Sequence, residues 1–193
     1  MGRSSEVSIK NDESLDELFR GRIRLIQKKD GYRFTEDPLI LGYFCRPAPT
    51  EKIIDLGTGC GIIPVILAAI YGIQRVEGIE LQPQLLDMAE RNIVLNNLTD
   101  RVTVKKGDLR KFRDLWTPAS FDVVISNPPY IPVNRGRVPP EKERALAKHE
   151  LTCTLKDLLQ ASCYLLRKGG RFCIIYPAQR LTDLLCGMSE HGI

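Results

Sequence analysis

The chain has 193 residues, enough for one domain with a well-buried core. Its 43% hydrophobic and 27% charged residues are close to the averages of soluble globular proteins, which excludes a disordered, fibrous or membrane-spanning chain. Lys and Arg outnumber Asp and Glu by 28 to 24, and the resulting charge of +4 is compatible with a nucleic-acid partner without requiring one.

Two further features of the sequence bear on its compartment. The longest apolar stretch, residues 62–72, is too short to cross a bilayer, and the polar amino terminus lacks the apolar core of a signal peptide. The six cysteines contain no CxxC pair, and most lie among apolar residues. We therefore expect a cytoplasmic protein with reduced cysteines and no membrane partner.

The expected elements alternate from residue 52 onward. Before that point, residues 31–45 lead into an apolar helical run that begins at Asp37 or Pro38. Short Val- and Ile-rich runs then predict strands at 53–56, 76–80, 102–106, 121–126 and 172–176. Leu, Ile and Ala at three- and four-residue spacing predict helices at 61–71, 83–96, 109–115, 154–166 and 179–188. This order predicts an α/β fold with a mainly parallel sheet and helices on both faces.

A glycine-rich turn follows the first of these strands. It reads Asp55-Leu56-Gly57-Thr58-Gly59-Cys60-Gly61 and opens a helix, so its glycines allow the backbone to turn tightly and to approach a ligand. It is not the dinucleotide fingerprint GxGxxG, because Ile62 stands where the third glycine belongs. The acid before the glycines favours a cationic ligand, whereas the structural alternative is a simple turn between strand and helix.

Two more acids end the next two strands. Glu80 stands 25 residues after Asp55, where a carboxylate can accept hydrogen bonds from both hydroxyls of a ribose. Asp108 ends the third strand and suits an adenine amino group, or it is only a helix cap. The carboxyl ends of parallel strands line the crevice in which open α/β sheets bind ligands. The three acids together therefore predict a nucleoside site.

The tetrapeptide Asn127-Pro128-Pro129-Tyr130 ends the fourth strand. The Asn127 side-chain oxygen and the Pro128 carbonyl can each accept one N–H bond from a planar nitrogen and hold it for attack on a methyl donor. The prolines stiffen the backbone, and Tyr130 offers a flat face for stacking. The structural alternative is a turn, for which Asn-Pro is an ordinary choice.

These motifs resemble those of the class I S-adenosylmethionine-dependent methyltransferases. The resemblance implies a Rossmann-like fold, S-adenosyl-L-methionine as cofactor with S-adenosyl-L-homocysteine as product, and no metal. It assigns catalysis to Asn127, Pro128, Pro129 and Tyr130. It assigns cofactor binding to Asp55, Gly57, Gly59, Gly61, Glu80, Leu81, Asp108, Leu109, Asn127 and Asp37. In this family Asp55 meets the methionine ammonium group, directly or through water.

The flanking segments, residues 27–39 and 145–150, resemble the bacterial family that methylates N6 of adenine 37 in a valine tRNA. The resemblance implies a tRNA substrate, with residues 1–50 covering the cofactor site and residues 51–193 forming the methyltransferase domain. Phe34 and Asp37 are then cofactor contacts, or else a core aromatic and a helix cap. The candidate tRNA contacts are Arg20, Arg22, Arg24, Lys28, Lys29, Arg33, Arg135, Arg137, Lys142 and Arg144.

Other functions stay open at this point. The tetrapeptide also serves glutamine N5-methylation of release factors and guanine-N2 methylation of ribosomal RNA, and a non-catalytic protein that binds S-adenosylmethionine or RNA is a third class. The usual class I sheet ends in two further strands, which are missing here, so we expect the chain to be a fragment with an incomplete sheet.

Overall fold

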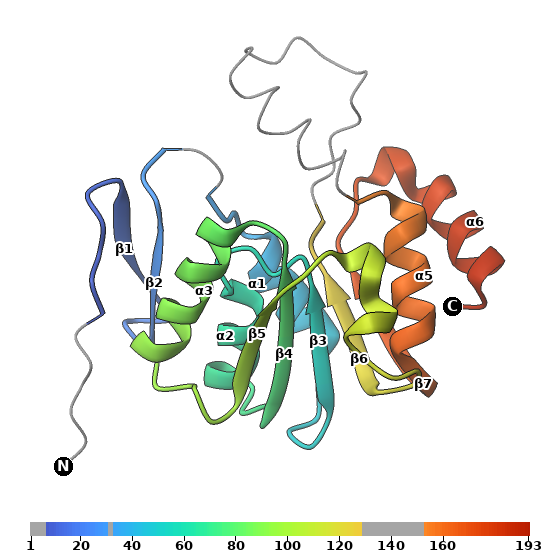
Figure 1. Cartoon of the computed structure of the whole chain (residues 1–193), viewed down its shortest axis with the longest axis horizontal. Helices are drawn as coiled ribbons and strands as arrows, with labels where there is room; N and C mark the ends of the chain where they lie inside the picture. Colours follow the sequence, from blue (N-terminus) through green and yellow to red (C-terminus); the bar gives the residue numbers. More distant parts are fainter. Residues whose placement is uncertain (1–6, 31–32, 129–152) are drawn as a thin grey trace, which may run out of the picture.

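The computed structural model describes residues 7–30, 33–128 and 153–193. Its centre is a five-stranded parallel sheet in the order β5-β4-β3-β6-β7 (Figure 1). The strands are β3 (Lys52–Leu56), β4 (Arg75–Glu80), β5 (Val102–Lys106), β6 (Phe121–Ser126) and β7 (Leu166–Ile174). The predicted α/β fold with a mainly parallel sheet is confirmed, and β3 to β6 begin and end within one residue of the predicted bounds.

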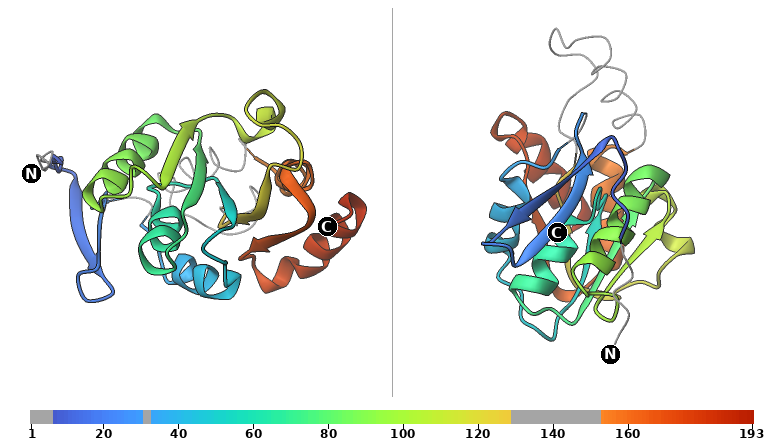
Figure 2. Two further views of the ribbon diagram at one scale, coloured as in Figure 1. Left: turned by 90° about the horizontal axis from the view of Figure 1, so that it is seen from below. Right: turned by 90° about the vertical axis from the view of Figure 1, so that its left-hand side faces the viewer.

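Helices cover both faces of the sheet (Figure 2). One core cluster joins Ile53 and Val123 to α1 (Asp37–Cys45), α2 (Ile62–Ile70) and α3 (Pro83–Leu95). The other joins Ile54 and Val124 to the 3₁₀ helix η1 (Leu109–Asp114) and to α5 (Leu155–Leu165). After η2 (Ala178–Arg180), α6 (Leu181–His191) packs against α5. Adjacent strand residues thus point to opposite faces, as the pleat requires.

Two elements differ from their predicted form. Residues 109–115 were expected to be a helix, but η1 is a 3₁₀ helix in which Lys111 leaves helical geometry. The last strand was expected at 172–176, but β7 begins at Leu166, where α5 ends, and stops at Ile174. Its pairing with β6 shifts register near Gly169, whose φ is +75°, and this break in the pleat hides the strand from a pattern of alternating residues.

An antiparallel hairpin precedes the parallel sheet and was not predicted. It consists of β1 (Glu13–Leu18) and β2 (Ile23–Lys28). Ile23, Leu25 and Ile26 are fully buried and join the core cluster of α1 to α3. Figure 1 shows β2 lying between β1 and α3, so the residues before the parallel sheet share a core with it.

A half-buried carboxylate near the start of β4 gathers partners from several elements. Glu77 accepts a hydrogen bond of 2.8 Å from the indole Nε1 of Trp116 and pairs with Lys52 and Lys105, each at 3.1 Å. Lys105 Nζ lies 5.1 Å from the centre of the indole ring, within the range of a cation–π contact. Trp116 also meets Phe121 edge-on. Together these contacts fasten β3, β4 and β5 to the segment after η1.

Within the described residues, no helix is long and apolar enough to cross a membrane. All six cysteines lie in this part of the chain and are free.

Candidate cofactor and substrate site

The carboxyl ends of β3, β4, β5 and β6 meet at one edge of the sheet, because these strands are parallel neighbours. A side-chain hydrogen bond joins the ends of β6 and β3. Ser126 Oγ, fully buried at the end of β6, donates to the Leu56 carbonyl at 2.7 Å. The residues that follow, Gly57 after β3 and Asn127 after β6, are therefore held side by side. The predicted cofactor and substrate residues adjoin each other at this edge.

The glycine-rich turn combines two kinds of glycine. Gly57 and Gly59 have φ of +79° and +58°, a region that glycine adopts without strain, and an added Cβ would meet no described atom within 4 Å. Gly61, with φ of +81°, differs because its added Cβ would lie 3.0 Å from the Cβ of Ala89 on α3. Gly57 and Gly59 thus leave room for a ligand, whereas Gly61 lets α2 approach α3.

Asp55 is the most unusual group of the site. It is fully buried, and neither carboxylate oxygen has a hydrogen-bond partner among the described residues; the same holds for the buried hydroxyl of Thr58. Burial raises the pKa of Asp55 to about 7, the nearby Thr58 hydroxyl opposes the rise without reaching hydrogen-bonding geometry, and the Glu80 charge adds to it. A buried carboxylate without partners is costly, which indicates a missing cationic or donor ligand.

Glu80 is buried at the end of β4 and holds the turn in place. Its Oε2 accepts from the Gly59 backbone N–H at 2.9 Å, and its Oε1 accepts from the Gln82 N–H at 2.8 Å. Each carboxylate oxygen has two lone pairs, so each can accept one further bond. The carboxylate both shapes the glycine-rich turn and retains the capacity that two ribose hydroxyls require.

Asp108 has the capping role that the sequence left open as its alternative. Its Oδ1 accepts from the Arg110 backbone N–H at 2.9 Å, and the guanidinium of Arg110 pairs with Oδ2 at 2.6 Å. This side-chain bond holds the pKa of Asp108 below its ordinary value. Leu109, which follows Asp108, and Leu81, which follows Glu80, are both half-buried. The adenine contact of Asp108 and Leu109 stays a prediction.

Asn127 and Pro128 follow β6 directly and are half-buried. Pro129 and Tyr130, the other two predicted catalytic residues, lie outside the described residues, as does the charged stretch 131–148. The structure therefore brings Asn127 and Pro128 to the edge that carries Asp55, Gly57 and Glu80.

Comparison with known proteins decides the family. A family model described as a methyltransferase domain matches residues 48–191. The chain belongs to the methyltransferase domain family.

Relatives and solved structures agree with this assignment. A tRNA1(Val) (adenine(37)-N6)-methyltransferase of Porphyromonas gingivalis is 32% identical over 158 residues, which cover 79% of this chain and 61% of that protein. One of Trichodesmium erythraeum with the same name is 31% identical, covering 75% and 60%. The putative transferase PH0793 of Pyrococcus horikoshii has this fold, with a TM-score of 0.66, 16% identity and coverage of 95% and 62%. The chain spans about three fifths of the length of these two curated relatives.

The predicted site residues that precede the matched domain are Phe34 and Asp37. Phe34 packs against the core cluster, as the core alternative requires, and Asp37 is the half-buried first residue of α1. Arg33 pairs with Asp16 at 2.7 Å and also donates to Ser14 and the Lys28 carbonyl. The contacts of Phe34 and Asp37 with a cofactor stay predictions.

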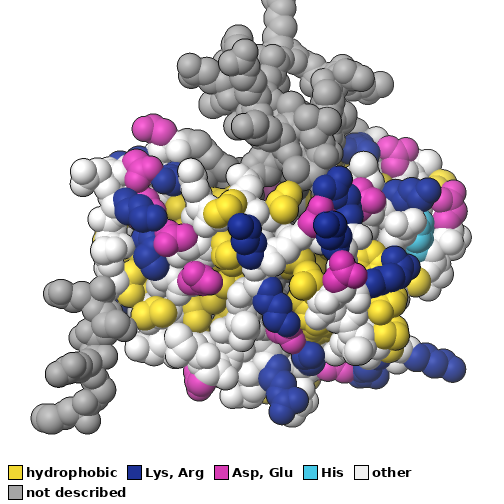
Figure 3. Space-filling model, in the orientation of Figure 1, with side chains coloured by type: hydrophobic (Ala, Val, Ile, Leu, Met, Phe, Trp, Pro, Cys, Tyr) yellow, Lys and Arg dark blue, Asp and Glu magenta, His cyan; other side chains and the backbone are white. Residues whose placement is uncertain are grey.

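The basic residues proposed for tRNA divide into three groups. Lys28 pairs with Asp12, Lys29 donates to the Asn11 carbonyl, and Arg33 is paired as above. Arg20, Arg22 and Arg24 are exposed at or near the hairpin turn, and their side chains have no partner among the described residues. Arg135, Arg137, Lys142 and Arg144 lie outside the described part. On the face seen in Figure 3, Asp and Glu side chains lie among the Lys and Arg side chains.

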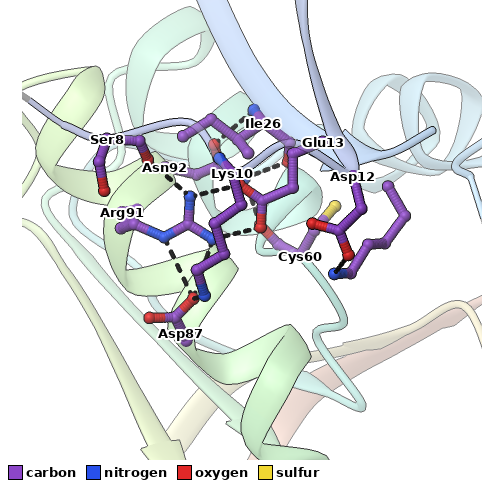
Figure 4. A network of polar contacts seen from close by, with 10 residues as sticks. Ser8, Lys10, Asp12, Glu13, Ile26, Cys60, Asp87, Arg91 and Asn92 are labelled. Carbon is purple, nitrogen blue, oxygen red and sulfur yellow. Dashed lines mark hydrogen bonds and ion pairs between the residues drawn. The ribbon is translucent and has the colours of Figure 1, made fainter.

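Sequence reasoning missed a set of buried polar residues that hold the site rather than line it. Ser126 is fully buried at the end of β6, and a polar residue closing a mostly apolar run was the signal that the sequence offered. Asn92 is fully buried on α3, where asparagine is a poor helix former. Beside it, Arg91 clamps Glu13 with bonds of 2.6 and 2.8 Å (Figure 4). In the described residues no group of three His, Cys, Asp or Glu side chains could hold a metal ion.

Proposed function

We propose that this chain is the S-adenosylmethionine-binding part of an N-methyltransferase that acts on the exocyclic N6 of an adenine in tRNA. The observation that carries the proposal is the fully buried Asp55 carboxylate, which has no partner among the described residues. It lies just before Gly57 and Gly59, at which an added Cβ would meet no described atom within 4 Å. A ligand with a cationic amino group supplies what this carboxylate lacks. The residues present therefore fit the methionine end of S-adenosylmethionine.

The remaining acids fit the nucleoside end of the same ligand. Glu80 can accept from two ribose hydroxyls while it keeps its bonds to the Gly59 and Gln82 backbone. Asp108 can use its remaining lone pairs for an adenine amino group beside Leu109. Leu81, half-buried next to Glu80, offers an apolar surface to the adenosine.

The reacting end needs positioning rather than strong acid or base chemistry. When bound, S-adenosylmethionine supplies a methyl group on a sulfonium, which is already an activated leaving group. The side-chain oxygen of Asn127 and the carbonyl of Pro128 would each accept one N–H hydrogen bond from the amino group of the substrate, which turns the nitrogen lone pair out of conjugation and toward the methyl group. Pro129 and Tyr130 complete the motif, with Tyr130 as the stacking face.

The tRNA substrate is supported by the names of the curated relatives and by the unpaired arginines of the hairpin. Arg20, Arg22 and Arg24 are free to contact phosphates, and such contacts weaken as salt rises. A release factor glutamine is the alternative substrate, because an amide nitrogen has the same planar chemistry.

The test is incubation of this chain with labelled S-adenosylmethionine and total RNA, followed by nucleoside analysis and by mass spectrometry of added release factor. We expect N6-methyladenosine in tRNA. Methylated glutamine without methylated adenosine would replace the proposed substrate, and the absence of cofactor binding by calorimetry would overturn the proposal.

Substitution of the predicted acceptor separates chemistry from binding. Asn127→Ala should lower kcat by about 100-fold or more, the scale found when one hydrogen-bonding group of a reacting centre is removed. The affinity for S-adenosylmethionine, measured by calorimetry, should stay within about twofold of the unmodified chain, because Asn127 is only one of the predicted cofactor contacts and the others are kept. Equal loss of cofactor binding and turnover would instead make Asn127 a structural residue.

A further inference from the structure

A side chain of α3 binds the edge of β2 that is not paired with β1. Asn92 on α3 accepts from the Ile26 backbone N–H through Oδ1 at 2.7 Å and donates from Nδ2 to the Ile26 carbonyl at 2.9 Å. The amide thus pairs with both backbone groups of Ile26, as a neighbouring strand would. Because Asn92 and Ile26 are both fully buried, water does not compete for these bonds.

One helical turn later, Asn96 repeats the arrangement. Its Oδ1 accepts from the Arg24 N–H at 3.0 Å, and its Nδ2 donates to the Arg24 carbonyl at 2.7 Å. Residues two apart on a strand expose their backbone groups on the same edge, and side chains four apart on a helix share a face. Asn92 of α3 and Asn96, the residue that caps the carboxyl end of α3, therefore bind β2 in the same way.

The two asparagines differ in their third bond. Nδ2 of Asn96 donates to the carbonyl of Asn92 within its own helix, at 2.7 Å. Nδ2 of Asn92 donates to the carbonyl of Cys60 at 2.9 Å, in the glycine-rich turn (Figure 4). Cys60 lies between Gly59, whose N–H is bound by Glu80, and Gly61, which packs on Ala89.

We propose that Asn92 is a positioning residue for the cofactor site: anchored to the hairpin through Ile26, it fixes the carbonyl of Cys60 and so sets the shape of the glycine-rich turn. This inference rests on the proposed binding of S-adenosylmethionine at that turn. The turn is otherwise held from the β4 side, by Glu80 and by the Ile79 carbonyl that accepts from Gly57 and Thr58. Asn92 binds the turn from α3. Because Asn92 is also bonded to β2, cofactor affinity depends on the hairpin being packed against α3.

The experiment compares Asn92→Ala with Asn96→Ala in this chain, because both lose a pair of bonds to β2 and only the first loses the bond to Cys60. Calorimetry should show the dissociation constant of S-adenosylmethionine raised about tenfold by Asn92→Ala, the scale of one buried hydrogen bond, and changed less than about twofold by Asn96→Ala. The KM for the cofactor should rise in parallel, while kcat at saturating cofactor is kept. Equal effects of the two substitutions, or none, would overturn the inference.

A second measurement holds even where Asn92→Ala does not fold. Coupling between two sites is reciprocal, so saturating S-adenosylmethionine should slow hydrogen exchange of the Ile26 amide in the unmodified chain. If the cofactor binds but hydrogen exchange at Ile26 is unchanged, the role of Asn92 is overturned and the proposed function is not. Failure of the unmodified chain to bind the cofactor would instead overturn the proposed function, so the two failures are distinguishable.

Discussion

Two regions of this protein bury polar side chains, and they treat them in opposite ways. Between the hairpin and α3, Glu13, Asn92 and Arg91 find partners for their polar atoms within the fold. At the glycine-rich turn, the carboxylate of Asp55 and the hydroxyl of Thr58 find none among the described residues. An unmade hydrogen bond of a buried group costs about 1–3 kcal/mol, and an uncompensated charge costs more.

The difference separates polar groups that hold the fold from polar groups that serve a ligand. Satisfied buried groups fix one arrangement of the hairpin on α3, as a fully bonded network does. The unsatisfied carboxylate destabilises the ligand-free fold, and a cofactor that supplies its partner stabilises the fold on binding. Substitutions in the two regions should therefore change stability with opposite sign.

The largest effect is expected for Asp55→Asn. Because burial raises the pKa of Asp55 from its ordinary value of 3.8 to about 7, the folded chain keeps a proton that the unfolded chain has already released. This contribution to stability is complete below the ordinary value and is lost as pH rises through about 7. Above that pH, Asp55→Asn should raise the free energy of unfolding by up to about 4 kcal/mol, on the scale of 1.4 kcal/mol per pKa unit, while S-adenosylmethionine binding is abolished.

Urea denaturation at pH 5 and pH 8 measures this, with Asp122→Asn as the matched control. Asp122 accepts from the Lys52 backbone N–H at 2.6 Å and pairs with Arg167, contacts that lower its pKa. Its substitution should destabilise the chain at pH 8. Destabilisation by Asp55→Asn at pH 8 would contradict the contrast between the two regions.

A smaller loss is expected for Glu13→Ala in the satisfied region. Glu13 is 3% exposed and binds Arg91 through both oxygens. Its removal leaves a partly buried guanidinium whose remaining partners among the described residues are Asp87 and the Ser8 carbonyl. Breaking one partner of a buried pair costs about 3–5 kcal/mol, and the remaining partners should reduce this to about 2 kcal/mol.

Denaturation at pH 8 and hydrogen exchange across β1 and β2 measure the loss. The Arg91 hydrogen bond lowers the pKa of Glu13, so the stabilisation is present above the ordinary value of 4.5 and disappears as pH falls below it. The cost of Glu13→Ala should therefore fade in acid. A cost that persists unchanged below that pH would assign the effect to packing rather than to the ion pair.

The smallest effect is expected for Lys10→Met. Lys10 reaches Asp87 at 2.7 Å in the same network, but both side chains are about half exposed, at 51% and 45%. Exposed ion pairs contribute about 0–1 kcal/mol, and salt screens them. Thermal denaturation at low and high salt should give a difference below about 0.5 kcal/mol that vanishes at high salt. A larger loss of stability would contradict this, because it would mean that the Lys10–Asp87 pair contributes as much as a buried ion pair does.

The sequence predicts the parallel sheet well because its signals are local. β3 to β6 are Val- and Ile-rich runs bounded by Gly, Asp or Asn. The carboxyl ends of β3, β4 and β5 carry the three acids that mark the site, and Asn127 follows β6. β1 was missed because Glu, Ser and Asp fill most of it, and its partner β2 supplies the buried residues instead.

The supporting residues were missed for a different reason. Asn92 and Ser126 act on partners 66 and 70 residues away, Ile26 and Leu56, and no local pattern reports such pairs. Likewise, the sequence gives no means of telling Gly61, which packs on Ala89, from Gly57 and Gly59, which face open space.

The environment of Trp116 makes the intrinsic tryptophan fluorescence of the chain a probe of its sheet. It is the one tryptophan of the sequence and is 8% exposed. Its indole donates a hydrogen bond to the Glu77 carboxylate, and the Lys105 ammonium, which pairs with the same carboxylate, lies over the indole ring. All three residues belong to the strands or to the segment after η1, and none is a predicted site residue. Indole emission therefore follows the separation of β4 and β5 during unfolding, so fluorescence can track the stability of the sheet while calorimetry follows the ligand.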